Sequence, residues 1–177
     1  MAGTKLTHPA IAHAERVLKD LYLPRIVDCL EKLSPAQIWW RANDASNSVG
    51  NLVLHLTGNV RQWIISGLGG EADTRQRDLE FSERGPLSRR VLISRLRRTV
   101  LAACRVLHRL PSEELARVRT TQKYRVTGME AALHVAEHFS HHAGQIILLT
   151  KLLTGSDLKF THLPGEKKKP GRKLPTW

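Results

Sequence analysis

The sequence predicts an all-α protein: one four-helix bundle with a short extra helix and a flexible basic tail. Apolar residues recur at helical spacing over four long stretches of the chain. Prolines, glycines and capping residues stand where these stretches begin and end. No segment is convincing as a strand, and four long helices joined by connectors of these lengths favour a bundle.

The first long helix is predicted over residues 9–33. Pro24 lies inside it and lacks a backbone N–H, so we expect a kink or a break near Leu23. A Ser-Pro pair at 34–35 then opens a short helix that ends with two tryptophans, at 39–40. We expect this tryptophan pair to close one end of the bundle by packing rather than to stack on a ligand.

The second long helix is predicted to begin at Asn47 or Ser48, both good capping residues, and to end at Ser66 before a run rich in glycine. It is apolar on nearly every side, so it should be buried. Its polar residues form one narrow stripe: Asn51, His55, Asn59 and Gln62. Buried polar groups without partners cost roughly 1–3 kcal/mol each. A metal ion would satisfy the histidine, and Asn59 or Gln62 could bond beside it.

A charged segment without periodicity, residues 71–85, leads to the third long helix. This helix is predicted to run from Pro86 to about Leu110. A polar connector of about fifteen residues follows. The last helix is predicted to begin at Thr127, with a glutamate three residues later in capping-box spacing, and to end at 153–154 before a glycine.

A chain of 177 residues suits one domain, which we assign to residues 1–163, followed by a flexible basic tail at 164–177. The net charge is +12, and arginines on the polar face of the third helix contribute much of it. Such a surface can attract phosphates or acidic substrates. A solvated basic face is favoured over nucleic-acid binding, because aromatic residues do not interleave with the basic ones and no recognition-helix motif is present.

Three features predict a cytoplasmic protein without a membrane partner. The N-terminus has no continuous apolar segment like that of a secretory signal, and no stretch approaches the roughly 18 apolar residues of a membrane span. Cys29 and Cys104 are isolated, which argues against a disulfide framework and fits a reducing compartment. We expect both thiols to lie in the core.

Four of the nine histidines fall within residues 134–142, and they predict a metal site. Residues four apart share a helix face, so His134 with His138, or His138 with His142, could chelate one ion. His55, in the polar stripe of the second helix, is the candidate third ligand. Three imidazoles could bind Zn²⁺, Ni²⁺, Fe²⁺ or Mn²⁺, and the residue types do not choose among them. Three protein ligands leave positions open for water or substrate, which is typical of catalytic sites.

Residues 134–138 also spell HxxEH, the inverted zinc-peptidase motif, with Glu137 as the base. Such peptidases are larger and take a further carboxylate ligand from a helix well downstream. Here only Asp157 and Glu166 follow, both after the last predicted helix. The peptidase interpretation is therefore not favoured.

The chain resembles the DinB-like superfamily, DNA-damage-inducible four-helix bundles that include bacillithiol transferases, and within it an uncharacterised bacterial branch. Three segments carry the resemblance: NSVGNLVLHLTGNVRQWI, DTRQRDLEFSER and HVAEHFSHHAGQIILLTKLLTGSDLKF. It covers residues 39–163 and implies a bundle of the DinB/YfiT-like type. The metal triad of the superfamily is one His on the second helix plus an HxxxH pair directly before Gly-Gln. This pattern maps onto His55, His138 and His142, and so favours the second pair over the first.

The resemblance implies a metal-dependent thiol transferase or hydrolase that acts on a small molecule, and it leads us to expect a homodimer. In such enzymes the metal is thought to activate the thiol of a low-molecular-weight cofactor. Arg75, Arg77 and Arg84 could hold the carboxylates of that cofactor, or pair with acidic residues of their own loop. His141, where relatives often have an aromatic residue, could act as acid or base or point to solvent. The alternative is a non-enzymatic stress-response module whose basic surface binds nucleic acid.

Overall fold

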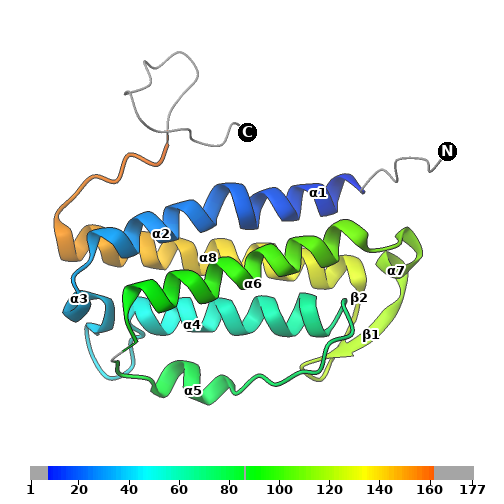
Figure 1. Ribbon diagram of the computed structural model, residues 1–177, viewed down its shortest axis with the longest axis horizontal. Coiled ribbons are helices and arrows are strands. Elements are labelled where there is room, and N and C mark those ends of the chain that lie inside the picture. The colour runs from blue at the N-terminus through cyan, green and yellow to red at the C-terminus, as the bar shows by residue number, and fades with distance from the viewer. Residues whose placement is uncertain (1–7, 86, 162–177) are drawn as a thin grey trace, which may run out of the picture.

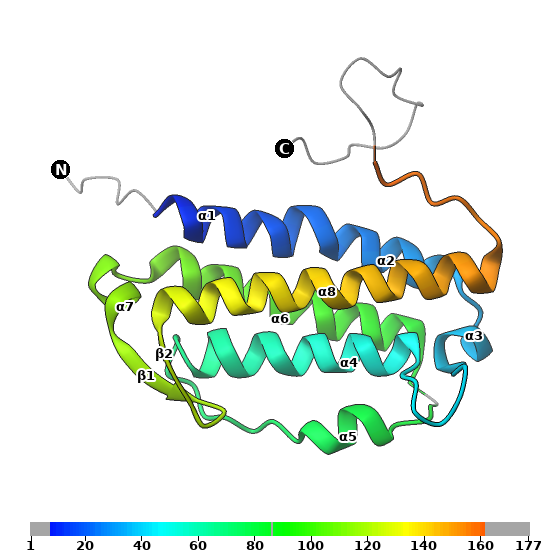
Figure 2. The same cartoon turned by 180° about the vertical axis from the view of Figure 1, so that it is seen from behind.

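Four helical rods pack side by side and form the predicted bundle (Figures 1 and 2). The computed structural model describes residues 8–85 and 87–161. The rods are, in chain order, α1 (Pro9–Arg16) with η1 (Val17–Tyr22) and α2 (Leu23–Lys32), α4 (Val49–Val60) with η2 (Arg61–Ser66), α6 (Arg89–Arg109), and α8 (Gly128–Thr154). Pro86, the predicted start of the third helix, the boundary predicted at 163 and the predicted flexible tail lie outside the described residues.

The first rod continues through the position near Leu23 where a kink or break is expected. Its middle part, η1, is π-helical: the N–H of Leu23 donates to the carbonyl of Leu18, five residues earlier. Pro24 follows in the first turn of α2 and lacks an N–H, so no backbone hydrogen bond runs from this residue to the preceding turn. The widened turn therefore accommodates the proline within a continuous rod.

Capping residues fix the starts of three helices, as the sequence predicts. Ser34 begins α3 (Pro35–Trp39), Ser48 begins α4 and Thr127 begins α8, each through a reciprocal capping box with the residue three positions later. A cap of this kind is worth about 1 kcal/mol. Gly155 ends α8 with a φ of 63°, the left-handed conformation that glycine adopts most readily.

The connector between α6 and α8 contains two strands as well as a helix, so the prediction of no strand is wrong here. After α7 (Ser112–Ala116), β1 (Val118–Thr121) and β2 (Tyr124–Thr127) pair as an antiparallel hairpin. Gln122 and Lys123 form its two-residue turn, with φ of 49° and 71°. Glycine or asparagine usually occupies such a turn, so the sequence lacks the usual signal for a hairpin.

A short helix, α5 (Arg77–Ser82), lies in the charged segment where the sequence indicates no periodicity. The side-chain amide of Asn51 on α4 donates to the backbone carbonyls of Glu80 and Glu83, each at 2.9 Å. In both views α5 and the hairpin lie on the same side of the bundle, along α4 (Figures 1 and 2). The charged segment is thus fastened to the polar stripe of α4.

Most of the buried apolar residues form one cluster, and Cys29 and Cys104 are buried in it as free thiols, as predicted. The Trp39 ring closes one end of the bundle against Gly50, where an added Cβ would lie 2.7 Å from the indole. Trp40 is 42% exposed, so only the first of the two tryptophans packs as expected. Among the described residues, no helix is long and apolar enough to cross a membrane.

Candidate metal centre

Three histidines from two helices meet between α4 and α8. His55 comes from the polar stripe of α4, and His138 and His142 are one turn apart on α8. Each offers one ring nitrogen, and these nitrogens all lie within 4.8 Å of one another. The Nε2 atoms of His55 and His138 are 3.0 Å apart. The structure therefore brings the three predicted ligands together, at a spacing that one ion could share.

His134, the alternative partner of His138, is engaged elsewhere. Its ring packs against Trp63 with the centroids 4.1 Å apart and the planes tilted by 37°, and its centroid is 5.6 Å from that of His138. The centroids of His138 and His142 are closer, at 4.5 Å. Of the two HxxxH pairs, the structure thus places the second in the histidine group.

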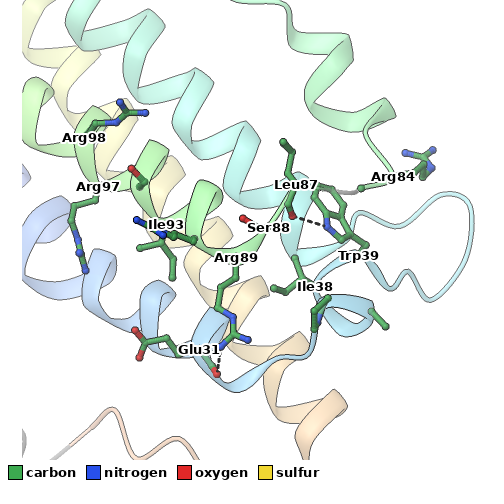
Figure 3. Close-up of a pocket in the computed structure, with 15 residues that line it drawn as sticks. Glu31, Ile38, Trp39, Arg84, Leu87, Ser88, Arg89, Ile93, Arg97 and Arg98 are labelled. Atoms are coloured by element: carbon green, nitrogen blue, oxygen red, sulfur yellow. Dashed lines mark hydrogen bonds between the residues drawn. The ribbon is translucent and has the colours of Figure 1, made fainter.

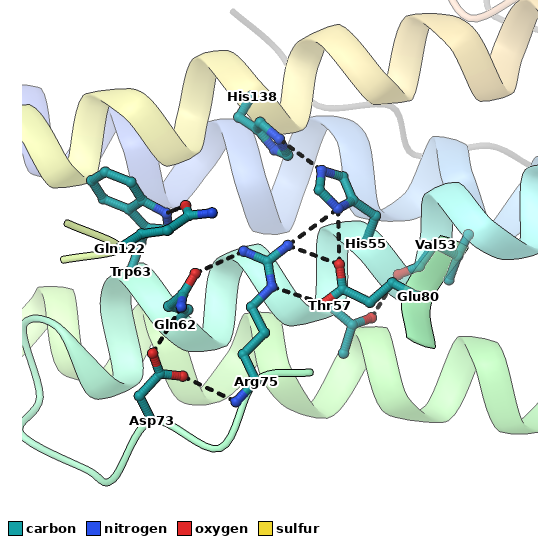
Figure 4. A network of polar contacts seen from close by, with 10 residues as sticks. All are labelled: Val53, His55, Thr57, Gln62, Trp63, Asp73, Arg75, Glu80, Gln122 and His138. Atoms are coloured by element: carbon teal, nitrogen blue, oxygen red, sulfur yellow. Dashed lines mark hydrogen bonds and ion pairs between the residues drawn. The ribbon is translucent and has the colours of Figure 1, made fainter. Parts of the chain in front are cut away.

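A buried carboxylate orients the His55 ring (Figure 4). Nδ1 of His55 is 2.9 Å from Oε2 of Glu80. Arg75 donates to both oxygens of the same carboxylate, from Nε at 2.7 Å and from Nη2 at 2.8 Å. Nη2 of Arg75 also lies 3.1 Å from Nδ1 of His55. An ionised carboxylate has only acceptors, so it accepts from the arginine and, at the shorter distance, from Nδ1 of His55. His55 then carries its proton on Nδ1, and the lone pair on Nε2 faces His138.

The Arg75–Glu80 pair is ionised although it is buried: the two side chains are 3% and 9% exposed. Burial alone would raise the pKa of the Glu80 carboxyl, but hydrogen bonds from Arg75 and His55 outweigh burial and lower it. Gly58 on α4 makes room for the pair. A Cβ at this position would collide with Oε1 of Glu80 and lie 2.9 Å from Nε of Arg75.

Gln62, which continues the polar stripe into η2, also finds its partners in the charged segment. Gln62 accepts from Nη1 of Arg75 at 2.8 Å and donates to Asp73 at 2.7 Å. This hydrogen bond is the main reason that the pKa of Asp73 is lowered. Asn59 differs, because its Oδ1 is buried without a hydrogen-bond partner among the described residues. Of the two residues expected to bond near the site, Gln62 therefore does so, through Arg75.

The α8 side of the centre is held more sparsely. Nδ1 of His142 is 2.7 Å from Oε1 of Gln145, which fixes the proton on Nδ1 and leaves Nε2 free to bind. Nδ1 of His138 is buried and has no hydrogen-bond partner among the described residues. Burial, followed by the neighbouring histidines, lowers the pKa of His138 to about 3, and burial also lowers that of His142. Both rings are thus neutral near pH 7, which is the form that binds a metal.

Three other predicted site residues, Arg77, Arg84 and His141, lie outside the group of three histidines. Arg77 lies over the ring of Phe81, 4.9 Å from its centroid, and that ring is 4.7 Å from the ring of His55. Arg84 donates to the backbone carbonyls of Phe81 and Glu83 and lines a separate groove. His141 is exposed on α8, with its ring centroid 5.0 Å from that of His142.

Two residues that orient the ligands are not evident from the sequence pattern. Glu80 belongs to a segment without periodicity, so nothing in the sequence places its carboxylate against a particular side chain of α4. Gln145 carries a weak signal, because it stands three positions after His142 and such side chains are neighbours on a helix. Both bond to the ring nitrogen that faces away from the proposed ion.

Comparisons with known proteins agree with this fold. The family model described as "Protein of unknown function (DUF1572)" matches residues 16–167. No curated protein matches the sequence. Among solved structures, the DinB-like protein YjoA from Bacillus subtilis is similar with a TM-score of 0.62 and 18% identity, over 85% of this chain and 94% of that one. At this identity the similarity shows the fold. The chain belongs to the DUF1572 family of proteins of unknown function, and its fold is like that of a DinB-like protein.

Proposed function

We propose that this protein binds one divalent metal ion through His55, His138 and His142 and is a metal-dependent thiol transferase or hydrolase. The observation that carries the proposal is the convergence of three ring nitrogens within 4.8 Å, two of them on imidazoles that burial keeps neutral. An ion held by three imidazoles would supply a Lewis acid with open positions, which lowers the pKa of a bound thiol or water. The candidates stay Zn²⁺, Ni²⁺, Fe²⁺ and Mn²⁺.

The protein's own residues supply orientation and charge. Glu80 keeps the Nε2 lone pair of His55 directed toward α8, and Arg75 keeps Glu80 ionised. A carboxylate on the far nitrogen of an imidazole also makes that imidazole a more basic ligand. Since this role occupies Arg75, it is Arg77, exposed beside Phe81, that we assign to a carboxylate of a low-molecular-weight thiol.

Metal analysis of the purified protein tests the site. Protein made without a histidine tag and supplied with Zn²⁺ is expected to retain about one ion per chain after gel filtration, and His138→Ala to retain below about a tenth of that. His141→Ala is the matched control, since it removes an exposed imidazole from the same helix and should leave the metal content unchanged. Equal metal in His138→Ala and the wild type would refute the ligand assignment.

An activity assay tests the reaction separately. The loaded protein, a low-molecular-weight thiol and an alkylating electrophile are expected to give thioether faster than the same mixture with His138→Ala. If both proteins hold their expected metal content and neither accelerates thioether formation or ester hydrolysis, the metal site stands and the transferase or hydrolase proposal fails. A selective increase in KM for the thiol in Arg77→Ala would support the role given to that arginine.

A further inference from the structure

A pocket separate from the metal centre lies between the end of α2, the short helix α3 and the first half of α6 (Figure 3). Its volume is about 1170 Å³, which is large for a site that binds a small molecule. None of the histidines of the metal centre lines it, nor do Glu80 and Arg75. It is therefore a separate feature, here called the arginine groove and defined by the residues that follow.

The polar wall of the arginine groove is strongly basic. Four exposed arginines line it, together with the partly buried Arg89: Arg84, Arg90, Arg97 and Arg98. One acid, Glu31, lines it as well. No carboxylate in the described part of the chain lies within ion-pair distance of any of these five guanidiniums. Arg89 instead donates to the backbone carbonyl of Glu31 at 2.8 Å and ties α6 to the end of α2.

The floor of the groove is apolar. Ile38 is buried, and Trp39, Leu87 and Ile93 are partly buried and pack on the core. The indole N–H of Trp39 donates to the carbonyl of Leu87 at 3.3 Å, so this side chain offers the groove only its carbon atoms. An apolar floor beside guanidiniums that form no ion pair with a described carboxylate suits a ligand with one anionic end and one hydrocarbon end.

We propose that the arginine groove binds a free anionic amphiphile, a molecule with a phosphate or carboxylate head and an apolar tail. The head would lie among the arginines and the tail along Ile38, Trp39 and Ile93. Charge complementarity selects this occupant. The C-terminal segment 164–177 carries five basic residues and one acid, so it is too basic to complement the groove. A second copy of the chain, with a net charge of +12, does not complement it either. Single-stranded nucleic acid needs exposed aromatic faces, whereas the one indole here is packed against Gly50.

Calorimetric titration of the full chain with octyl phosphate, kept below its micelle concentration, tests the proposal. We expect one molecule to bind per chain, at least about tenfold more tightly than inorganic phosphate or octan-1-ol, because either probe alone uses half of the groove. Octan-1-ol binding as tightly as octyl phosphate would show that the arginines take no part. Inorganic phosphate binding as tightly would show that the apolar floor takes no part, and either result overturns the proposal.

Variants locate the site. The double variant Arg97→Glu with Arg98→Glu is expected to weaken octyl phosphate at least about tenfold, since two attractive charges become repulsive. Arg105→Glu with Arg109→Glu is the matched control: both arginines are exposed on the same helix, outside the groove, and the change in net charge is equal. Equal weakening in both variants would mean general surface attraction and overturn the proposal. So would tighter binding of a single-stranded oligonucleotide that the first variant abolishes, which would assign the groove to nucleic acid.

Discussion

The two sides of the metal centre hold their histidines in different ways. On the α4 side, His55 is the end of a buried chain of polar contacts that runs through Glu80 and Arg75 to Gln62. On the α8 side, helix geometry sets the spacing of His138 and His142, and one exposed amide supports the second ring. On the α4 side, the contacts that orient the ligand also stabilise the fold. On the α8 side, the contact that orients the ligand is exposed and contributes little to folding stability. Changes on the α4 side should therefore cost both folding free energy and metal affinity.

Glu80→Ala should have the largest effect on the fold. It leaves the guanidinium of Arg75, which is 3% exposed, without its anionic partner. Breaking a buried ion pair in this way costs about 3–5 kcal/mol of unfolding free energy, and losing the carboxylate behind His55 should weaken Zn²⁺ by about 10–100-fold. Urea unfolding and a competitive chelator titration measure the two. Asp78→Ala removes an exposed carboxylate from the same segment and is the control. A loss of metal affinity without any loss of stability would contradict the coupling on the α4 side.

Gly58→Ala should have the next largest effect, and the sign of its change in unfolding free energy is informative. In an ordinary helix interior this substitution stabilises by roughly 0.5–1 kcal/mol. At this position the new methyl group meets the Arg75–Glu80 pair, so we expect a loss of about 1–3 kcal/mol and weaker metal binding. Gly144→Ala on α8 is the matched control, because apart from its chain neighbours and the adjoining backbone of its own helix no described atom lies within 4 Å of the added Cβ. Thermal melts compare the two variants, and stabilisation of both would show that the space beside Gly58 is not needed.

The unfolding free energy should depend on pH in the way expected for an ionised Glu80. Its pKa in the folded protein is lowered below the ordinary 4.5, so its stabilisation is present above that pH and is lost as the pH falls through the folded-state pKa. Glu80→Gln cannot titrate. The free energy difference between wild type and this variant should therefore be largest near pH 6 and shrink below about pH 4. Urea unfolding at a series of pH values measures it, and a difference that stays constant with pH would mean that Glu80 is not ionised in the folded protein.

Gln145→Ala should have the smallest effect on the fold. The residue is exposed, so its stability should change by no more than about 0.5 kcal/mol. Loss of its bond to Nδ1 of His142 should weaken Zn²⁺ by about tenfold, at the low end for residues that support a ligand. Chelator competition at fixed pH provides the measurement. A drop in stability like that of Glu80→Ala would show that the two sides of the centre are not held differently.

The fold could be predicted because it follows from helical periodicity. Periodicity leaves two HxxxH pairs open, and the family resemblance selects His138 and His142. The capping residues mark the starts of α4 and α8, and four-residue spacing puts His138 and His142 on one face. The packing partner of His55 could not be derived this way, because Glu80 lies in a segment whose position depends on tertiary contacts with Asn51 and Gly58. The hairpin escapes prediction for a similar reason, since its turn residues are not typical of turns. The homodimer, the cytoplasmic location and the acid or base role of His141 stay predictions.

The π-helical segment η1 determines which side chains at the two ends of the first rod face the core. Nineteen residues separate Ile11 from Leu30, and at 3.6 residues per turn these two side chains would point about 100° apart. Both are nevertheless buried in the same core, at 2% and 0% exposure. The wide turn holds one residue more than an α-helical turn, and this single extra residue brings the two apolar faces back into phase. An α-helical rod of the same sequence would show the core only one of its halves, so the number of residues between 17 and 22 matters here as much as their identity.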